Sequence, residues 1–199
     1  MVANGRSTLN PARENILERV RLALRVEAHR PLPATDALIF PPVENVEARF
    51  REEFVAIKGE WVENLGEFLK GFTTIATDGS ELVQSAVGPG NATLRDADLG
   101  VTGCDCLIAQ TGSVVISTRS AGDRGLSVLP AVHLVIARRN QIVADLAAAT
   151  ALLRERYAGH WPSALSVITG PSRTADIEKI LVMGAHGPRR IAVYFVDQG

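Results

Sequence analysis

Three glycine-containing loops carry the side chains that could bind a small anion. The first joins two predicted strands through Gln110, Thr111, Gly112 and Ser113. Its glycine permits a tight turn, and its hydroxyl groups can reach an anion or a carbonyl group. A β-hairpin turn held by local hydroxyl hydrogen bonds explains the same residues, so this loop alone favours no single role.

The second loop leaves a predicted strand and opens a predicted helix, with the sequence Thr169-Gly170-Pro171-Ser172-Arg173-Thr174-Ala175-Asp176-Ile177-Glu178. Gly170 lets the backbone approach a ligand, and the hydroxyl of Ser172 or Thr174 can cap the helix. Acidic residues at 176 and 178 suit the positive end of a helix dipole. The guanidinium of Arg173 does not suit that end unless an anion or a nearby carboxylate offsets its charge. Because this planar group matches carboxylate and phosphate, Arg173 is a candidate ligand contact.

The third loop places a histidine between glycines, in the sequence Met183-Gly184-Ala185-His186-Gly187-Pro188. A histidine titrates near neutral pH, so His186 can act as acid, base or hydrogen-bond donor. A turn histidine that is bonded to a backbone carbonyl is the alternative. Ligands of open α/β sheets bind beside loops at the carboxyl ends of strands, and all three loops have that character. We expect Gly112, Arg173 and His186 to meet at one pocket rim.

The elements that must position these loops change in character along the chain. A short amphipathic helix begins where Asn10 caps and Pro11 takes the first position. A proline-rich arm covers residues 29–43, and a longer helix with an aromatic stripe is predicted over residues 45–70. We therefore expect an N-terminal helical extension over residues 1–71. An α/β domain should follow over residues 72–199.

Short β-branched runs in the second part predict alternating strands and helices. The predicted strands cover residues 73–76, 106–109, 113–117, 132–137, 165–169 and 191–196, and the predicted helices cover residues 80–86, 141–157 and 175–180. Continuous apolar runs such as 193–196 suit strands that are covered on both faces. The fold class is therefore α/β, a layered sheet.

Composition narrows the class of protein. The chain has 199 residues, and 46% of them are hydrophobic, which is typical of a globular domain. Its net charge of -1 disfavours general binding to nucleic acid or to anionic membranes. No apolar run is long enough to span a membrane, and the first residues lack the apolar stretch of a secretory signal. A cytoplasmic protein is the expectation.

Several familiar sites are absent from the sequence. It contains no Gly-x-Gly-x-x-Gly, no P-loop and no Gly-x-Ser-x-Gly motif, so dinucleotide, nucleotide-hydrolysing and serine-hydrolase chemistry are disfavoured. Cys104 and Cys106 are too close for an unstrained disulfide, and free thiols are expected. These two cysteines cannot hold an iron–sulfur cluster alone, which usually takes four thiolates. Zinc held by both cysteines and a histidine lacks the usual paired spacing, and we expect no metal in this chain.

Read together, four segments resemble the lactate-utilisation protein C (LutC) family, the LUD domain. The matching residues are Ile108 to Ser113, then Arg124 with Ser127, Pro130 and His133, then Ile168 to Glu178, and finally Gly184 to Pro188. The resemblance implies a Rossmann-like layered sheet similar to the ribose-5-phosphate isomerase, glucosamine-6-phosphate deaminase and CoA-transferase group. It also implies a part in the oxidation of L-lactate to pyruvate, with iron–sulfur clusters in partner proteins and no cofactor in this chain. Gln110 stands where an acidic residue is expected, which argues against a carboxylate nucleophile of the CoA-transferase kind.

The leading hypothesis is a subunit of a lactate-oxidising system that binds a small carboxylate or another anion. Arg173 or Arg124 would neutralise the carboxylate, and His186 would move a proton. The candidate binding residues are Thr111, Gly112, Ser113, Arg124, Gly170, Ser172, Arg173, Thr174, Asp176, Gly184 and Gly187.

Two alternatives belong to other classes. A non-catalytic assembly or regulatory subunit could present the aromatic stripe of Phe50, Phe54, Trp61 and Phe68 to a partner, although core packing explains that stripe as well. An independent enzyme acting on a phosphorylated or CoA-like substrate rests on the shared fold alone.

Overall fold

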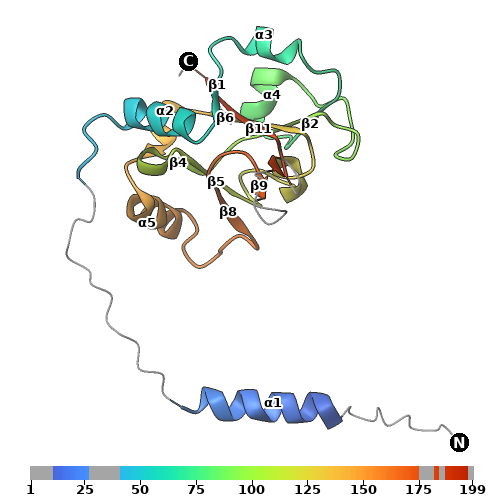
Figure 1. Cartoon of the computed structure of the whole chain (residues 1–199), viewed down its shortest axis with the longest axis vertical. Helices are drawn as coiled ribbons and strands as arrows, with labels where there is room; N and C mark the ends of the chain where they lie inside the picture. The colour runs from blue at the N-terminus through green and yellow to red at the C-terminus, as the bar shows by residue number, and fades with distance from the viewer. Residues whose placement is uncertain (1–10, 27–40, 175–181, 184–186, 197–199) are drawn as a thin grey trace, which may run out of the picture. The chain divides into compact units, whose positions relative to one another are not determined.

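The computed structural model describes residues 11–26, 41–174, 182–183 and 187–196. The chain divides into two compact units, residues 1–41 and 42–199. In the first unit, α1 (Pro11–Leu24) has no buried residue. The second unit contains all the described strands and all the other described helices (Figure 1).

A five-stranded parallel sheet forms the centre of the second unit. Its strands follow the order β1-β11-β6-β3-β2. They comprise β1 (Glu60–Trp61), β11 (Arg190–Phe195), β6 (Val132–Ala137), β3 (Leu99–Thr102) and β2 (Ile75–Thr77). Every residue of β3 and β6 is buried, as expected for strands that are covered on both faces.

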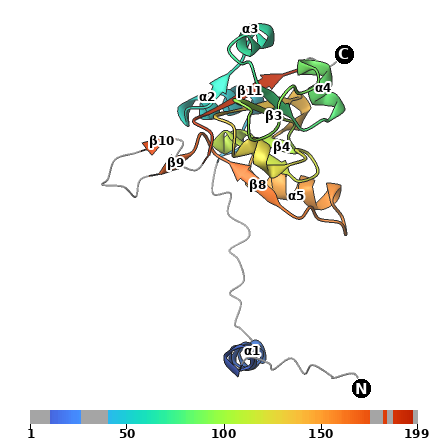
Figure 2. The same cartoon turned by 90° about the vertical axis from the view of Figure 1, so that its right-hand side faces the viewer.

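A four-stranded mixed sheet packs against the first one. Its strands follow the order β7-β4-β5-β8, with β5 antiparallel to both of its neighbours. They comprise β7 (Ile142–Val143), β4 (Cys106–Ile108), β5 (Ser113–Ser117) and β8 (Leu165–Ile168). A separate pair, β9 (Arg173–Thr174) and β10 (Val182–Met183), stands to one side (Figure 2).

Helices cover the outer faces of the two sheets, giving the α/β layered fold that the sequence predicts. The five-stranded sheet is covered by α3 (Leu65–Leu69) and α4 (Glu81–Val87), and α5 (Leu146–Arg156) packs on the four-stranded sheet (Figure 1). The core between the sheets includes Val135, Val193, Leu107 and Val114. Short 3-10 helices η1 (Ala109–Thr111), η2 (Arg124–Ser127) and η3 (Arg139–Gln141) connect the strands.

The long helix predicted over residues 45–70 is wrong. α2 (Val46–Ala56) ends because Lys58 adopts a φ of +71° and the amide of Gly59 donates to the carbonyl of Phe54 at 2.7 Å. A Cβ on Gly59 would lie 2.6 Å from the Phe54 ring, so only glycine fits there. Trp61 then enters β1, and a separate short helix, α3, follows.

The boundary of the α/β domain also differs from the expected residue 72. Phe50 and Phe54 of α2 are fully buried in the core between the sheets, and Trp61 of β1 packs against that core. Core packing, and not a partner surface, therefore explains the aromatic stripe at Phe50 and Phe54. Since α2 and β1 belong to the packed unit, the division falls between Pro41 and Pro42.

The other predicted elements agree with the structure in most places. The strands over 113–117 and 132–137 are confirmed, and those over 73–76, 106–109, 165–169 and 191–196 are confirmed within two residues at each end. The helix over 80–86 is shifted by one residue, whereas that over 141–157 begins only at Leu146, because Asp145 caps it and β7 precedes it. β3 was missed, and the helix predicted over 175–180 lies outside the described residues. No helix in the described ranges is long and apolar enough to cross a membrane.

Candidate functional site

Hydroxyl groups from the first two predicted loops form a continuous chain. The hydroxyl oxygens of Thr111 and Ser113 are 2.7 Å apart, and those of Ser113 and Thr169 are 2.8 Å apart. Gly112 allows this arrangement because it turns the chain from η1 into β5 with a left-handed φ of +62°. β5 and β8 run antiparallel with Val114 opposite Ile168, so their adjoining ends bring Ser113 beside Thr169. The two loops therefore meet, as the sequence predicts.

The glycines of these two loops lie against α2. A Cβ on Gly112 would lie 2.4 Å from the amide nitrogen of Phe54, and one on Gly170 would lie 2.6 Å from the carbonyl oxygen of Ile57. Both glycines also have positive φ. The space that a ligand would need beside Gly112 and Gly170 is thus occupied by the last turn of α2, and the glycines serve this close approach.

Arg173 binds the end of the same helix. Its Nη2 group donates a hydrogen bond to the carbonyl of Ile57, the residue that caps α2. A cation is favourable there, since a helix presents negative partial charge at its carboxyl end. Arg173 itself lies on β9, paired with Met183, and not at a described helix start. Its guanidinium makes no ion pair with a carboxylate of the described residues, and neither does the neighbouring Lys58.

The third predicted loop reaches the second one. The amide of Ser172 donates to the carbonyl of Pro188 at 2.9 Å, and a Cβ on Gly187 would lie 3.0 Å from the Cβ of Ser172. We call the segments 111–113, 169–173 and 187–188 the loop cluster. Gly184, His186 and Asp176 lie outside the described residues, as does the side chain of Thr174.

The loop cluster lies at the amino ends of the five-stranded sheet. Pro188 precedes β11, Gly59 precedes β1, and the amide of Arg189 donates at 2.9 Å to the carbonyl of Ala131, just before β6. The expectation that the third loop lies at carboxyl ends is therefore wrong for this sheet. In the other sheet, the segment 169–173 follows the carboxyl end of β8, and Thr111 and Gly112 follow the carboxyl end of β4.

Arg124 belongs to a different segment of the chain. It is the first residue of η2. In this short helix Gly125 packs against the side chain of Leu94. The carbonyl oxygen of Leu126 approaches Gly100 of β3, where an added Cβ would lie 2.2 Å from it. No hydrogen bond or ion pair joins the side chain of Arg124 to the described residues of the loop cluster, and Arg124 is exposed. The structure thus brings together Thr111, Gly112, Ser113, Gly170, Ser172, Arg173 and Gly187, but not Arg124.

His133 is a buried polar residue of β6. Its Nε2 lies 2.9 Å from the hydroxyl oxygen of Thr102, whereas its Nδ1 has no hydrogen-bond partner. Burial lowers the pKa of His133 to about 4, so the imidazole is neutral at physiological pH.

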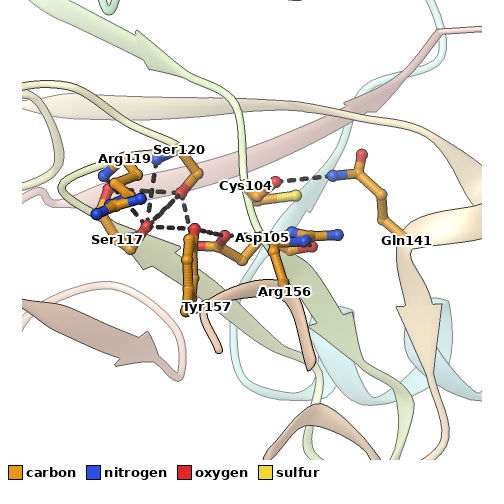
Figure 3. A network of polar contacts seen from close by, with 8 residues as sticks. All are labelled: Cys104, Asp105, Ser117, Arg119, Ser120, Gln141, Arg156 and Tyr157. Carbon is orange, nitrogen blue, oxygen red and sulfur yellow. Dashed lines mark hydrogen bonds and ion pairs between the residues drawn. The ribbon is translucent and has the colours of Figure 1, made fainter. Parts of the chain in front are cut away.

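A second polar cluster, which the sequence did not predict, surrounds the buried carboxylate of Asp105 (Figure 3). The carboxylate accepts hydrogen bonds from the hydroxyls of Tyr157 at 2.5 Å and Ser120 at 2.7 Å, and from Arg156 at 3.2 Å. The hydroxyl of Ser117 lies 3.0 Å from that of Tyr157. Burial and the bond to Asp105 raise the pKa of Tyr157. The cluster therefore joins the turn after β3, the turn after β5 and the end of α5.

One sequence signal could have pointed to Asp105: it is a charged residue directly before the apolar run of β4. A charge at such a position is rarely buried without partners. Its partners come from residues 117–120 and 156–157, and no spacing in the sequence links these segments.

Cys104 and Cys106 flank Asp105 and are free, buried thiols. Burial, and then the negative charge of Asp105, raise the pKa of Cys106 to about 11; burial also raises the pKa of Cys104. The thiols are therefore poor nucleophiles and poor ligands as they stand. Across the described ranges, no three His, Cys, Asp or Glu side chains gather in a group that could hold a metal ion.

Comparison with known proteins identifies the family. The family model of the LUD domain matches residues 44–196. The chain belongs to the LUD domain family. Its LUD domain thus includes α2 and β1, in agreement with their place in the core.

Relatives of this LUD domain include lactate utilization protein C 1 of Bacillus mycoides, 37% identical over 105 residues, which are 52% of this chain and 45% of the relative. Lactate utilization protein C of Bacillus subtilis is 35% identical over 105 residues, 52% of this chain and 44% of the relative. The match therefore spans about half the length of these relatives. A crystal structure of a DUF162 family protein from Deinococcus radiodurans superposes with a TM-score of 0.55 and 23% identity, over 76% of this chain and 96% of that one, which supports the α/β fold.

Proposed function

We propose that this LUD domain acts in lactate utilisation and binds a small carboxylate, such as lactate, at the loop cluster. The relatives named lactate utilization protein C support the process. The observation that carries the site is the meeting of three predicted loops beside Arg173, a cation with no carboxylate partner among the described residues.

The chemistry of the loop cluster suits a carboxylate. The bond from Arg173 to Ile57 uses one of its N–H groups, so further donors of the guanidinium remain for two parallel bonds to a carboxylate. The exposed Thr111 can add a hydroxyl donor, because Ser113 and Thr169 complete the hydroxyl chain behind it. Arg124 is not part of this proposed site.

Oxidation of lactate to pyruvate would need further groups. We propose that His186, the residue before Gly187, accepts the proton of the lactate hydroxyl. The hydrogen on C2 would leave with its two electrons, as a hydride, to a two-electron acceptor carried by a partner protein. Iron–sulfur clusters in partner proteins, which the resemblance to the lactate-utilisation family implies, would then take up the electrons. The hydroxyl proton and the C2 hydride of lactate are thereby both assigned, and no cofactor is proposed in this chain.

Isothermal titration calorimetry on the purified chain tests the site. L-lactate should bind, and Arg173→Lys should weaken binding about tenfold or more, because lysine cannot make two parallel bonds. Arg154→Lys, at an exposed position of α5, is the matched control and should bind as the natural chain does. Far-ultraviolet circular dichroism and urea unfolding establish that the variants are folded.

The outcomes separate the alternatives. Equal binding by Arg173→Lys would place the carboxylate elsewhere, and no binding of lactate or pyruvate would favour a non-catalytic assembly subunit. Strong thermal stabilisation by a phosphorylated or CoA-like compound, without any by lactate, would favour the independent enzyme.

A further inference from the structure

The β8 strand is the open edge of the four-stranded sheet. It pairs with β5 on one side, and no described strand pairs with its other side. Leu165, Ser166 and Val167 are all exposed, and Trp161, just before the strand, is also exposed at 53%. An open edge strand with apolar side chains can form hydrogen bonds with a strand of another chain. Natural proteins prevent this pairing with a charged side chain, a proline or a bulge in the edge strand. Residues 163–169 contain no charge and no proline.

The hydrogen bonds to β5 define what β8 offers at its free edge. The amide of Thr118 donates to the carbonyl of Ala164, which makes Ala164, Ser166 and Ile168 the residues bonded to β5 in this antiparallel pair. The amide and carbonyl groups of Leu165 and Val167 therefore point to the open edge.

The side chains of β8 have two faces. Leu165 and Val167 lie opposite Ser117 and Val115 of β5, and Val115 packs against α5. The helix covers the central strands, but it leaves Leu165 and Val167 37% and 46% exposed. β8 lies beside α5 (Figure 2). Leu165 and Val167 therefore form an apolar strip with free backbone groups along this edge.

The strip is complementary to itself. In an antiparallel pair of two copies centred on Ser166, each Leu165 lies opposite the other copy's Val167, and Ser166 lies opposite Ser166. One step further out, Ala164 faces Ile168, and beyond these Ser163 faces Thr169. Every pair therefore joins apolar with apolar or hydroxyl with hydroxyl, and no like charges meet.

Backbone geometry agrees with this centre. An antiparallel pair centred on Ser166 makes Leu165 and the opposing Val167 a hydrogen-bonded pair, and these are the residues whose amide and carbonyl groups are free. We propose that β8 is a homodimerisation edge, at which two copies of this chain join their four-stranded sheets into one continuous sheet. The self-matching sequence favours a second copy over a strand of another protein.

Paired charge variants test both the dimer and its register by sedimentation equilibrium of the full chain. The natural chain should show a concentration-dependent dimer. The double variant with Leu165→Lys and Val167→Lys sets lysine opposite lysine and should weaken the dimer about 100-fold or more. With Leu165→Lys and Val167→Glu, each lysine faces a glutamate, and the dimer should return and become salt-sensitive. Val55→Lys, at an exposed position of α2, is the control and should leave association unchanged.

A cross-link provides a second, independent readout. Ser166→Cys should form a disulfide-linked dimer under mild oxidation, because the two Ser166 positions face each other in a pair without hydrogen bonds, where Cα atoms approach to about 4.5 Å. Ser163→Cys faces Thr169 of the other copy and should not cross-link. The native cysteines are buried and do not compete.

Several results would overturn the proposal. They are a monomer at all concentrations up to the submillimolar range, equal behaviour of the Lys/Lys and Lys/Glu variants when circular dichroism shows both folded, or a dimer in which Ser166→Cys does not cross-link. None of these results bears on lactate binding, which is measured on the same chain by calorimetry.

Discussion

The hydroxyl of Tyr157 donates a 2.5 Å hydrogen bond to the carboxylate of Asp105, joining the end of α5 to the turn between β3 and β4. Both residues are buried. Ser120 and Arg156 supply the other donors, so the buried charge is satisfied by hydrogen bonds from two other parts of the chain. Together these bonds join α5 and the turn after β5 to the turn between β3 and β4.

Replacing Asp105 with asparagine should lower the free energy of unfolding by about 2–3 kcal/mol, because a buried acceptor of charge-assisted bonds is lost. Urea unfolding followed by circular dichroism measures this change. The control Glu155→Gln, at an exposed site, should change stability by less than about 0.5 kcal/mol. A loss of that small size in Asp105→Asn would contradict a structural role for the cluster.

The buried His133 predicts a pH dependence of stability. Burial lowers its pKa in the folded state to about 4, against about 6.5 in an unfolded chain, so the unfolded state binds the extra proton first as pH falls. The stability contributed by neutral His133 is complete above about pH 6.5 and is lost as pH falls toward 4, by about 3 kcal/mol at most. Urea unfolding between pH 7 and pH 5 measures this. His133→Gln should show a shallower dependence, and an unchanged slope would count against the buried, neutral imidazole.

Gly112 should tolerate alanine poorly. A Cβ there would lie 2.4 Å from the Phe54 amide nitrogen, in addition to the strain of a positive φ. We expect Gly112→Ala to destabilise the chain by about 3 kcal/mol or more. Gly159→Ala is the control: its φ is +76°, but nothing lies within 4 Å of the added Cβ, so about 1 kcal/mol of strain alone is expected. If thermal unfolding shows an equal loss of stability in the two variants, contact with α2 is not the reason that position 112 requires glycine.

The cysteines should be unreactive in the native chain. Cys106 is fully buried and its pKa is raised to about 11, so few thiolates exist near pH 8. Labelling by a disulfide reagent should be about 100-fold slower in buffer than in denaturant. Rapid labelling of native protein, followed by mass spectrometry of Cys104 and Cys106, would contradict this burial.

Some elements could be predicted because their signal is local. The strands over 113–117 and 132–137 are continuous apolar or β-branched runs. The long helix over 45–70 was wrong because its spacing of apolar residues continues through Trp61, although Gly59 is required by its contact with the Phe54 ring. β3 was missed since its four residues include Gly100, which a strand prediction disfavours and the approach of Leu126 requires.

The candidate site could also be predicted only in part. The loops around Gly112, Arg173 and Gly187 have glycines and hydroxyls close together in the sequence, and the structure brings them together. Their common neighbour, α2, could not be identified from loop sequences. The cluster around Asp105 depends on side chains that are far apart in the chain, so only the packing of α5 and β4 reveals it.

The division of the chain at Pro41 and Pro42 also tells where it could be shortened. A truncated protein starting at residue 42 would retain α2, whereas one starting at residue 72 would lack Phe50, Phe54 and the edge strand β1. The shorter fragment would leave a cavity against Val193 and Phe195. It would also leave one edge of β11 without a paired strand, so we expect the fragment to aggregate during expression.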